Sequence, residues 1–188
     1  MSELKLLADR SYRNYRSRLA ASIRLQSRQR AWNACLLALS VAMAVASIGL
    51  LSDEAMYGKA GPTVLVCVSV GALAASLVAA GLNYGARSRN MFMNYRALQK
   101  LSVEAESAQG RGSVDQDDIS KLTDRHNALL DDSENHTSAD YKSGVPGAPI
   151  SRWILWGSRT LTGLPYVALI APVLVLWPFA VWAIRGGS

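Results

Sequence analysis

Three long, uncharged apolar runs dominate the chain, at residues 31–52, 60–86 and 160–184. Each run is long enough to cross a bilayer as a helix, which needs about 20 consecutive apolar residues. The break between the first two runs, residues 53–59 (DEAMYGK), carries three charges and a glycine, and Pro62 opens the next run. These features predict a tight turn between two antiparallel spans, so the sequence indicates a transmembrane helical hairpin.

The segment before the hairpin predicts a cytoplasmic helix. Residues 1–30 contain no proline or glycine, so the helix should run directly into the first span. One face of this helix carries five residues at helical spacing: Tyr12, Tyr15, Leu19, Ile23 and Gln26. Two tyrosines on an apolar face favour a stalk helix that packs in a cytoplasmic bundle. An amphipathic arm on the lipid surface is the alternative.

Two further helices are expected after the second span. Residues 88–108 predict a second stalk helix, antiparallel to the first. Ser113 and Gln116 have the spacing of a capping box and predict another helix that ends near Leu130. His126 lies on the apolar face of that helix, which favours a packed core residue over a catalytic one.

A linker rich in glycine and proline, residues 143–151, leads into the third span. Tryptophans near both ends of this span are typical of interfacial anchors. Three prolines break its hydrogen-bond ladder and predict kinks: Pro165, Pro172 and Pro178. We expect this helix to lie at the periphery of the hairpin.

The expected fold class is therefore all-α. It is an integral membrane helical hairpin of two spans with cytoplasmic helical extensions and a third, C-terminal transmembrane helix. The predicted regions are a basic cytoplasmic stalk (1–30), the transmembrane hairpin (31–86), a cytoplasmic helical region (87–142), the linker (143–151) and the third transmembrane helix with an outer tail (152–188).

The net charge of +6 is distributed unevenly. Residues 1–30 hold eight bases and two acids, and four more bases follow the second span at residues 87–100. Since Lys and Arg near span ends mark the cytoplasmic side, the N-terminus should lie inside the cell and the C-terminus outside. The basic arm, which suits anionic membrane lipid, consists of Arg10, Arg13, Arg16, Arg18, Arg24, Arg28 and Arg30 together with Lys5. No motif supports direct nucleic-acid binding, and we do not expect it.

The charge balance reverses at residues 101–140, which hold ten acids and three bases. Asp131, Asp132 and Glu134 follow a predicted helix C-terminus, where the helix dipole disfavours acids. We therefore expect the acidic helix to dock on the basic arm, within one chain or between neighbouring chains. Two independently solvated faces are the alternative, because exposed ion pairs contribute little.

No catalytic motif stands out. The chain has no glycine-rich phosphate loop, metal-ligand spacing or serine elbow, so neither an enzyme activity nor a cofactor or metal is expected. The two cysteines, Cys35 and Cys67, should lie near opposite ends of the two spans, which predicts no disulfide.

Polar residues spaced by seven line both spans of the hairpin. They are Asn33, Ser40 and Ser47 in the first span and Ser69, Ser76 and Asn83 in the second. Seven residues are nearly two helical turns, so each set forms one stripe, and antiparallel spans can pair the two stripes in three layers. Polar contacts inside the hairpin and a wetted face that lines a pore both fit this pattern. Two helices cannot enclose a channel, so a pore needs several subunits.

Residues around and after the hairpin resemble those of a known family. The residues concerned are Asn94, Tyr95 and Arg96 after the second span, then Glu134, Asn135 and His136, then Asp140 and Tyr141. Over about residues 10–142 the chain resembles the SLATT family. These are two-transmembrane effectors associated with SMODS nucleotidyltransferases, SLOG sensors and some reverse transcriptases in bacterial defence islands. The third span departs from the usual pattern of two.

The resemblance implies an oligomeric, pore-forming or channel-like effector of a bacterial antiphage (abortive infection) system. It would lie in the bacterial inner membrane and stay inactive until a partner triggers it. The alternative is a membrane anchor or sensor that recruits a cytoplasmic defence enzyme such as a reverse transcriptase or nucleotidyltransferase. Glu134, Asn135 and His136 lie where a helix must stop, which favours a hydrogen-bonded helix end that holds the cytoplasmic bundle together over a ligand site.

Overall fold

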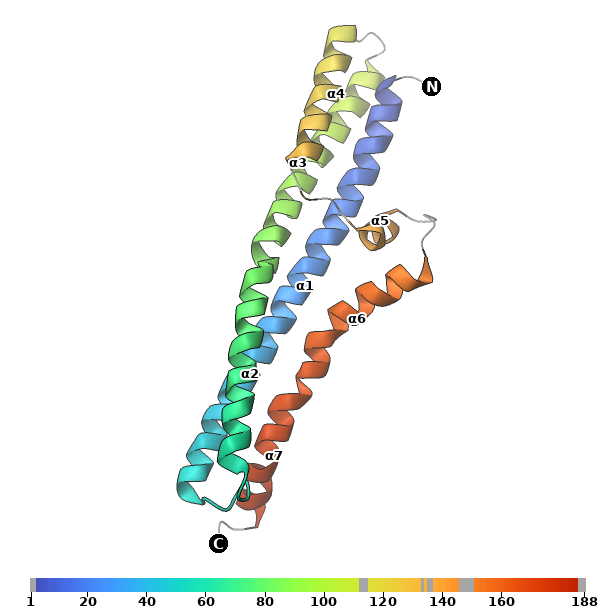
Figure 1. Ribbon diagram of the computed structural model, residues 1–188. Coiled ribbons are helices and arrows are strands. Elements are labelled where there is room, and N and C mark those ends of the chain that lie inside the picture. Colours follow the sequence, from blue (N-terminus) through green and yellow to red (C-terminus); the bar gives the residue numbers. More distant parts are fainter. Residues whose placement is uncertain (1–2, 112–114, 133, 135–136, 146–150, 186–188) are drawn as a thin grey trace. The chain divides into compact units, whose positions relative to one another are not determined.

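The computed structural model describes residues 3–111, 115–132, 134, 137–145 and 151–185. Within these residues the chain is all-α, as predicted, with helices joined by turns and no strand (Figure 1). The helices are α1 (Glu3–Ser52), α2 (Gly61–Leu82), α3 (Tyr84–Gly110), α4 (Gln116–Asp131), α5 (Ser138–Gly144), α6 (Arg152–Ala168) and α7 (Ile170–Ile184). Among the described residues, three helical stretches are long and apolar enough to cross a membrane: Glu3–Ser52, Gly61–Gly110 and Arg152–Ile184.

The chain forms two compact units. Unit 1 comprises Met1–Gln26 and Gly85–Arg159, and unit 2 comprises Ser27–Tyr84 and Thr160–Ser188. Helix α1 contributes its first half to unit 1 and its second half to unit 2. The apolar sequence of the spans therefore lies in unit 2, and most of the charged sequence lies in unit 1.

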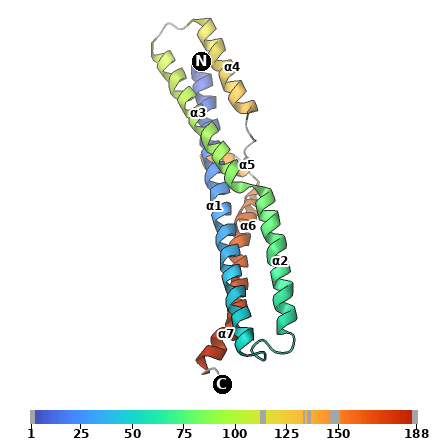
Figure 2. The same cartoon turned by 90° about the vertical axis from the view of Figure 1, so that its left-hand side faces the viewer.

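Unit 1 is a bundle in which the first half of α1 packs with α3 and α4 (Figure 2). One apolar cluster draws on all three helices, with Leu7 and Ala8 from α1, Ala105 from α3 and Leu122 from α4. The Ser102 hydroxyl donates to the Ala8 carbonyl at 3.4 Å, so the backbones of α1 and α3 approach each other closely here. Burial of apolar side chains in this cluster stabilises the bundle by about 25 cal/mol for each Å² removed from water.

The face that α1 buries differs from the predicted one. Ser11 and Ala21 are fully buried, whereas Tyr12 and Ile23, from the predicted packing face, are 43% and 59% exposed. Helix α1 does pack as a stalk, but through a face that combines Leu7 and Leu25 with small residues, because small side chains let neighbouring helices come closer than tyrosines do. The sequence prediction of the packing face was wrong, and the aromatic face remains at the surface.

The start of α4 also differs from the prediction. Helix α4 begins at Gln116, and its N-cap residue Asp115 makes no capping bond with its side chain. A capping box requires its second residue at the third helical position, and Gln116 occupies the first, so the predicted box is wrong. Ser113, its other predicted member, lies outside the described residues. A capping box does form at the start of α5.

Unit 2 contains the helical hairpin. The second half of α1 and α2 are joined by residues 53–59, where Gly58 adopts a φ of 66°, a conformation that glycine reaches without strain. The buried core of the hairpin is apolar and consists of Leu39, Ala42, Ala46 and Leu65 with Val175 of α7. The alanines allow α1 to approach its neighbours closely. Cys35 and Cys67 are both free thiols, as predicted.

Helix α7 belongs to the core of unit 2 rather than to its periphery. Val175 is buried in the hairpin cluster, and the Tyr57 hydroxyl donates to the Val175 carbonyl at 2.8 Å. A side chain on Gly49 of α1 would come within 3.0 Å of the Phe179 ring. The predicted peripheral position of the third span is therefore wrong, because small residues in α1 and a tyrosine in the turn accept α7 directly.

The third apolar run is interrupted, as its prolines predict. Helix α6 ends at Ala168 and α7 begins at Ile170, so Pro172 is the third residue of α7. Proline has no N–H to bond to the preceding turn, and it is tolerated in a first helical turn where that N–H has no partner within the helix. Pro165 and Pro178 lie inside α6 and α7.

Asn83 ends the second span. It adopts a left-handed conformation, with φ 46° and ψ 39°, and its N–H donates to the Ala80 carbonyl. Asparagine tolerates this conformation better than most residues, since its short polar side chain bonds locally. The second apolar run and the stalk helix that follows it are therefore two helices, α2 and α3, separated at this residue.

Candidate functional site

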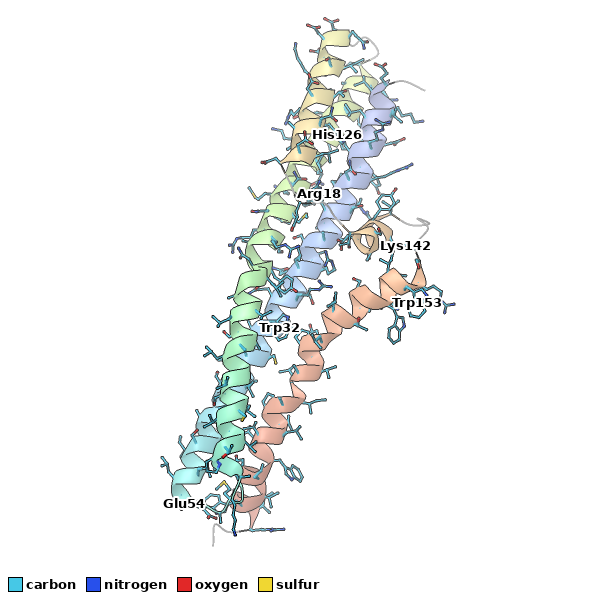
Figure 3. All side chains as sticks on the ribbon, viewed as in Figure 1. Arg18, Trp32, Glu54, His126, Lys142 and Trp153 are labelled. Atoms are coloured by element: carbon cyan, nitrogen blue, oxygen red, sulfur yellow. The ribbon has the colours of Figure 1, made fainter. Side chains whose placement is uncertain are left out.

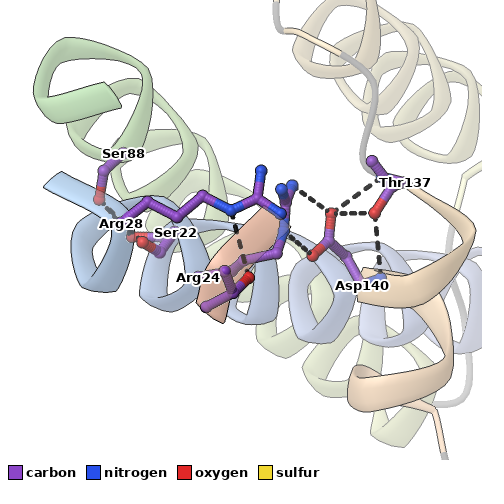
Figure 4. A network of polar contacts seen from close by, with 7 residues as sticks. Ser22, Arg24, Arg28, Ser88, Thr137 and Asp140 are labelled. Carbon is purple, nitrogen blue, oxygen red and sulfur yellow. Dashed lines mark hydrogen bonds and ion pairs between the residues drawn. The ribbon is translucent and has the colours of Figure 1, made fainter. Parts of the chain in front are cut away.

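An ion pair with two hydrogen bonds fastens the short helix α5 to α1. Arg24 donates from Nε to Asp140 Oδ1 at 2.7 Å and from Nη2 to Asp140 Oδ2 at 2.9 Å. The Asp140 side chain is only 2% exposed. Figure 4 shows the guanidinium of Arg24 facing the carboxylate, the bidentate arrangement that makes such pairs strong.

The same carboxylate closes the start of α5. The Thr137 N–H and hydroxyl donate to Asp140 Oδ2 at 2.9 and 2.7 Å, and the Asp140 N–H donates back to Thr137 Oγ1 at 3.3 Å. Burial raises the pKa of the Asp140 carboxyl, but the hydrogen bonds from Arg24 and Thr137 outweigh it and leave that pKa below its usual range. The pair is therefore charged at neutral pH, and its contribution to stability is lost only as the pH falls through the lowered pKa.

Arg18 lies in the interior of unit 1 (Figure 3) and is 1% exposed. Its Nη1 donates to the Glu134 carbonyl oxygen at 2.8 Å and lies 3.9 Å from the Met91 sulfur, while its Nε has no partner. Burial lowers the pKa of this guanidinium. An arginine so buried, with one N–H unsatisfied, makes this point of the bundle sensitive to any shift of residue 134.

Glu134 and Asn94 tie the end of α4 to α3. The Glu134 carboxylate accepts from Arg87 Nε at 2.9 Å, with both side chains partly exposed. Asn94 donates from Nδ2 to the Leu129 carbonyl at 2.6 Å, which satisfies a carbonyl in the last turn of α4. We call the set of Arg18, Arg24, Arg87, Glu134 and Asp140 the clasp.

The end of α5 rests on the backbone of α1. A side chain on Gly144 would meet the Arg16 carbonyl carbon at 2.6 Å and the Ser17 nitrogen at 2.7 Å. Arg16 Nε donates to the Gly144 carbonyl at 3.2 Å. Only glycine fits this contact, so both ends of the seven-residue helix α5 are fixed to α1.

His126 fixes α4 to α1. Its Nδ1 lies 3.0 Å from the Ser11 hydroxyl, and its Nε2 lies 3.5 Å from Asn14 Nδ2. The ring is buried, and this burial, together with the nearby positive charge of Arg10, lowers the pKa of His126. A packed core histidine is what the sequence predicted.

The structure brings part of the predicted motif together. Glu134 and Asp140 both contact arginines of α1, while Asn94 holds α4 and Tyr95 stacks among aromatic rings. Tyr141 is partly buried, Arg96 is exposed, and Asn135 and His136 lie outside the described residues. The functional roles of these motif residues stay predictions.

Sequence reasoning missed two features of the clasp. Arg18 is one of many arginines in the basic arm, and nothing in its spacing marks it as buried. The box of Thr137 and Asp140 does have a sequence signal, because a threonine three residues before an acid is a capping pattern.

The other arginines of the basic arm lie in different surroundings. Arg10, Arg13 and Arg30 are exposed. Arg28, in unit 2, is buried and donates from Nε to the Thr162 hydroxyl at 3.2 Å.

Helix α4 does pack on the basic arm of its own chain, but through His126 and apolar contacts, while Asp140, the acid that pairs with Arg24 of the arm, belongs to α5. The acids of α4 are exposed, which is closer to the alternative of separately solvated charged faces. Among the described ion pairs, none joins an acid of α4 to the arm.

The predicted polar stripes lie on the surface of unit 2. Ser40, Ser47 and Ser69 each donate a hydroxyl to a carbonyl of their own helix, three or four residues earlier. All six stripe residues are exposed, and the hairpin core is apolar. Pairing in three layers inside one hairpin is therefore not observed in the described residues, because small apolar residues make that contact instead. A role in an assembly of several chains stays a prediction.

The fold and the site together define a multi-span, all-α membrane protein with a charged helical bundle held by a buried ion pair. Among the described residues, no group of three His, Cys, Asp or Glu side chains could hold a metal ion. The model of one family, SMODS and SLOG-associating 2TM effector domain family 5, matches residues 1–184. The chain belongs to this SLATT family, which confirms the resemblance. No curated protein and no solved structure matches the chain.

Proposed function

We propose that this chain is an oligomeric, pore-forming membrane effector of a bacterial antiphage system. The family supplies the general role of a membrane effector in defence systems. The pore, the homo-oligomer and the trigger are what the resemblance implies, and the continuity of α1 and the exposed polar stripes support them. The chain would lie in the bacterial inner membrane, with its N-terminus and unit 1 in the cytoplasm, where a defence sensor or enzyme can reach the clasp.

The observation that carries the proposal is the continuity of α1. Its 50 residues form one helix from Glu3 to Ser52, without a glycine before Gly49. Arg18 and Arg24, the two clasp residues of α1, lie in its first half, and its second half is a candidate span. A partner that releases Asp140 from Arg24 changes the contacts made by the same helix whose second half is a candidate span. Such differential contact with two states is what shifts a conformational equilibrium.

The exposed polar stripes support a pore built from several chains. A lone hairpin would turn Asn33 and Asn83 toward lipid, where polar side chains are costly, although Asn33 Oδ1 accepts a hydrogen bond from Gln29 Nε2 at 3.0 Å. In an assembly of several chains whose stripes face a common axis, water in the pore would solvate these side chains instead. The serine hydroxyls, already bonded to their own helices, need no further partner and present an uncharged lining.

Potassium flux from proteoliposomes tests the pore. The purified full chain is reconstituted with an Arg24→Gln substitution that opens the clasp, and Ser40→Leu plus Ser76→Leu is added in a second sample. We expect the flux of the first sample to fall at least tenfold in the second. The matched control is Val41→Leu plus Leu77→Val, at exposed apolar positions of the same two helices, which should leave the flux unchanged.

Equal flux with and without the stripe substitutions would show that the stripes do not line the pore. A chain that binds a reverse transcriptase or nucleotidyltransferase and never conducts, even with the clasp opened, would favour the membrane anchor instead.

A further inference from the structure

Unit 1 leaves a cluster of aromatic side chains at its surface. Tyr12 and Tyr15 of α1 lie 5.1 Å apart between ring centroids, Tyr15 lies 5.9 Å from Tyr95 of α3, and Tyr95 lies 5.5 Å from Phe92. Tyr12 and Phe92 are 43% and 42% exposed. Large aromatic rings that gather at a surface mark an interaction site, since tyrosines and arginines dominate interface energies.

Basic side chains border this aromatic face. The Arg16 guanidinium lies over the Tyr12 ring, 5.9 Å from its centroid, and Arg96 of α3 is exposed one position after Tyr95. The face therefore combines apolar rings, phenolic hydroxyls that can donate, and two arginines. An acid also lies nearby: burial raises the pKa of the Tyr15 hydroxyl, and the charge of Glu106 adds to that shift. A partner with exposed carboxylates on a helix would match it.

Helix α4 carries such a surface. Asp117, Asp124 and Asp131 are spaced by seven, so they share one side of α4, and all three are exposed. Asp124 precedes His126 by two residues, about 200° around the helix, and His126 faces α1. The acidic side of α4 therefore lies opposite the His126 contact, and Asp124 also borders a groove that it shares with Leu6 and Arg10 of α1.

The two surfaces lie at the same level along α1. His126 contacts Ser11 and Asn14, and Asp124, two residues earlier on α4, lies beside Arg10 of α1, close to the level of Tyr12. The aromatic face belongs to α1 and α3, and the acidic side belongs to α4. Two different surfaces at one level of one subunit are what a closed ring requires, because each subunit must present one to each neighbour.

We propose that the aromatic face of unit 1 binds the acidic side of α4 from a second copy of this chain, head to tail around a ring. The inference deepens the proposed function, on whose oligomer it rests. It assigns the subunit contact outside the membrane to Tyr12, Tyr15, Phe92 and Tyr95 on one chain and to Asp117, Asp124 and Asp131 on the next.

Cross-linking of the full chain in membranes tests this contact. The background carries Cys35→Ser and Cys67→Ser, because these are the only two cysteines. The test variant adds Tyr12→Cys and Asp124→Cys in one chain, and a short bis-maleimide is applied. We expect a ladder of covalent dimers, trimers and larger species that stops at the ring size.

The controls separate a head-to-tail ring from other contacts. Each single cysteine variant should remain monomeric on a denaturing gel, and Tyr12→Cys with Met93→Cys, at a 68% exposed site on α3, should form no ladder. Dimers from Tyr12→Cys alone would indicate a two-fold contact and overturn the proposal. Absence of a ladder from the test variant would also overturn it. A Tyr12→Cys thiol that lipid shields from the maleimide in dilute, unassembled protein would overturn it too, because the aromatic face would then contact lipid and not a second chain.

The potassium flux assay on the same preparations keeps the two proposals distinguishable. Flux without a ladder would support the pore but contradict this interface, and the subunits would then have to associate through the spans alone. Absence of both flux and ladder would contradict the proposed oligomer as well as the proposed interface.

Discussion

Buried charge, rather than the number of ion pairs, decides which residues hold unit 1 together. The Arg24 and Asp140 side chains are 18% and 2% exposed, whereas those of Lys121 and Asp118 are 72% and 64% exposed. An exposed pair contributes about 0–1 kcal/mol. Loss of one partner from a buried pair costs more, about 3–5 kcal/mol, because the other charge stays buried and uncompensated.

A double-mutant cycle on the buried pair tests this difference. Arg24→Gln and Asp140→Asn are each expected to lower the free energy of unfolding of unit 1 by about 3 kcal/mol, measured by pulse proteolysis in detergent. The double variant should lose clearly less than the sum of the two, since neither charge is then left alone. Lys121→Ala is the matched control at an exposed pair, with an expected change below about 1 kcal/mol. Strictly additive losses would mean that the pair does not interact.

His126 should make the docking of α4 sensitive to mild acid. Burial and the nearby Arg10 lower the pKa of His126 in the folded chain, so the unfolded chain binds the proton more tightly. Stability from the neutral ring is therefore complete above the unfolded pKa of about 6.5 and is lost as the pH falls toward the lowered folded pKa. Hydrogen exchange of α4 amides, corrected for intrinsic rates, should accelerate between pH 7 and pH 5.5.

The matched variant for the pH experiment is His126→Gln, which keeps a hydrogen-bonding side chain and cannot titrate in this range. Its α4 amides should exchange with the same protection at both pH values. An equal acceleration in the variant would place the pH sensitivity elsewhere in the bundle.

For single residues, the sequence predicts a contact well when the contact follows from the type of residue and its place near a helix end. It predicts a contact poorly when the contact depends on how the helices pack. Glu134 stands out in the sequence because it follows a predicted helix end, and Asp140 stands out only through the family resemblance; both meet arginines. The burial of Arg18 could not be foreseen, since it depends on where α3 and the end of α4 come to lie.

Helix α5 is too short to be stable alone, and tertiary contacts hold it. Its seven residues are well below the length at which an isolated helix forms in water. The capping box at Thr137 fixes its start, and the contact of Gly144 with the backbone of Arg16 and Ser17 fixes its end.

Gly144→Ala tests the glycine contact. The added methyl group would overlap the α1 backbone at 2.6–2.7 Å, which α1 cannot relieve by a side-chain rotation. We expect a loss of about 1–3 kcal/mol in unit 1 and release of α5, seen as faster proteolysis after Lys142. Gly110→Ala, at a site with open space around the added methyl, should be neutral or slightly stabilising. Equal behaviour of the two variants would contradict the packing of α5.

The long elements are foreseeable and the packing faces are not. Uninterrupted apolar composition fixes the spans, so the hairpin and the proline break near Leu169 follow from the sequence. The predicted face of α1 is wrong because hydrophobicity points to Tyr12 and Ile23, whereas the buried face combines alanines and serines with Leu7 and Leu25. The position of α7 was misjudged because polar anchors at a span's ends say nothing of the neighbour it packs against.

For the whole molecule, α1 is the element shared by both units. Residues up to Gln26 belong to unit 1 and residues from Ser27 to unit 2, within one continuous helix. A signal that reaches the clasp therefore acts on the same helix that carries Asn33, Ser40 and Ser47. This continuity is the physical basis for the proposal that the clasp holds the pore closed.

Single-channel conductance of the purified full chain in planar bilayers tests that proposal most directly. Unmodified protein should stay closed, Arg24→Gln should conduct, and Arg13→Gln, at an exposed arginine of the same helix, should stay closed. An Arg24→Gln chain that remains folded and oligomeric and yet passes no current would contradict the account, as would a chain that conducts equally with its clasp intact.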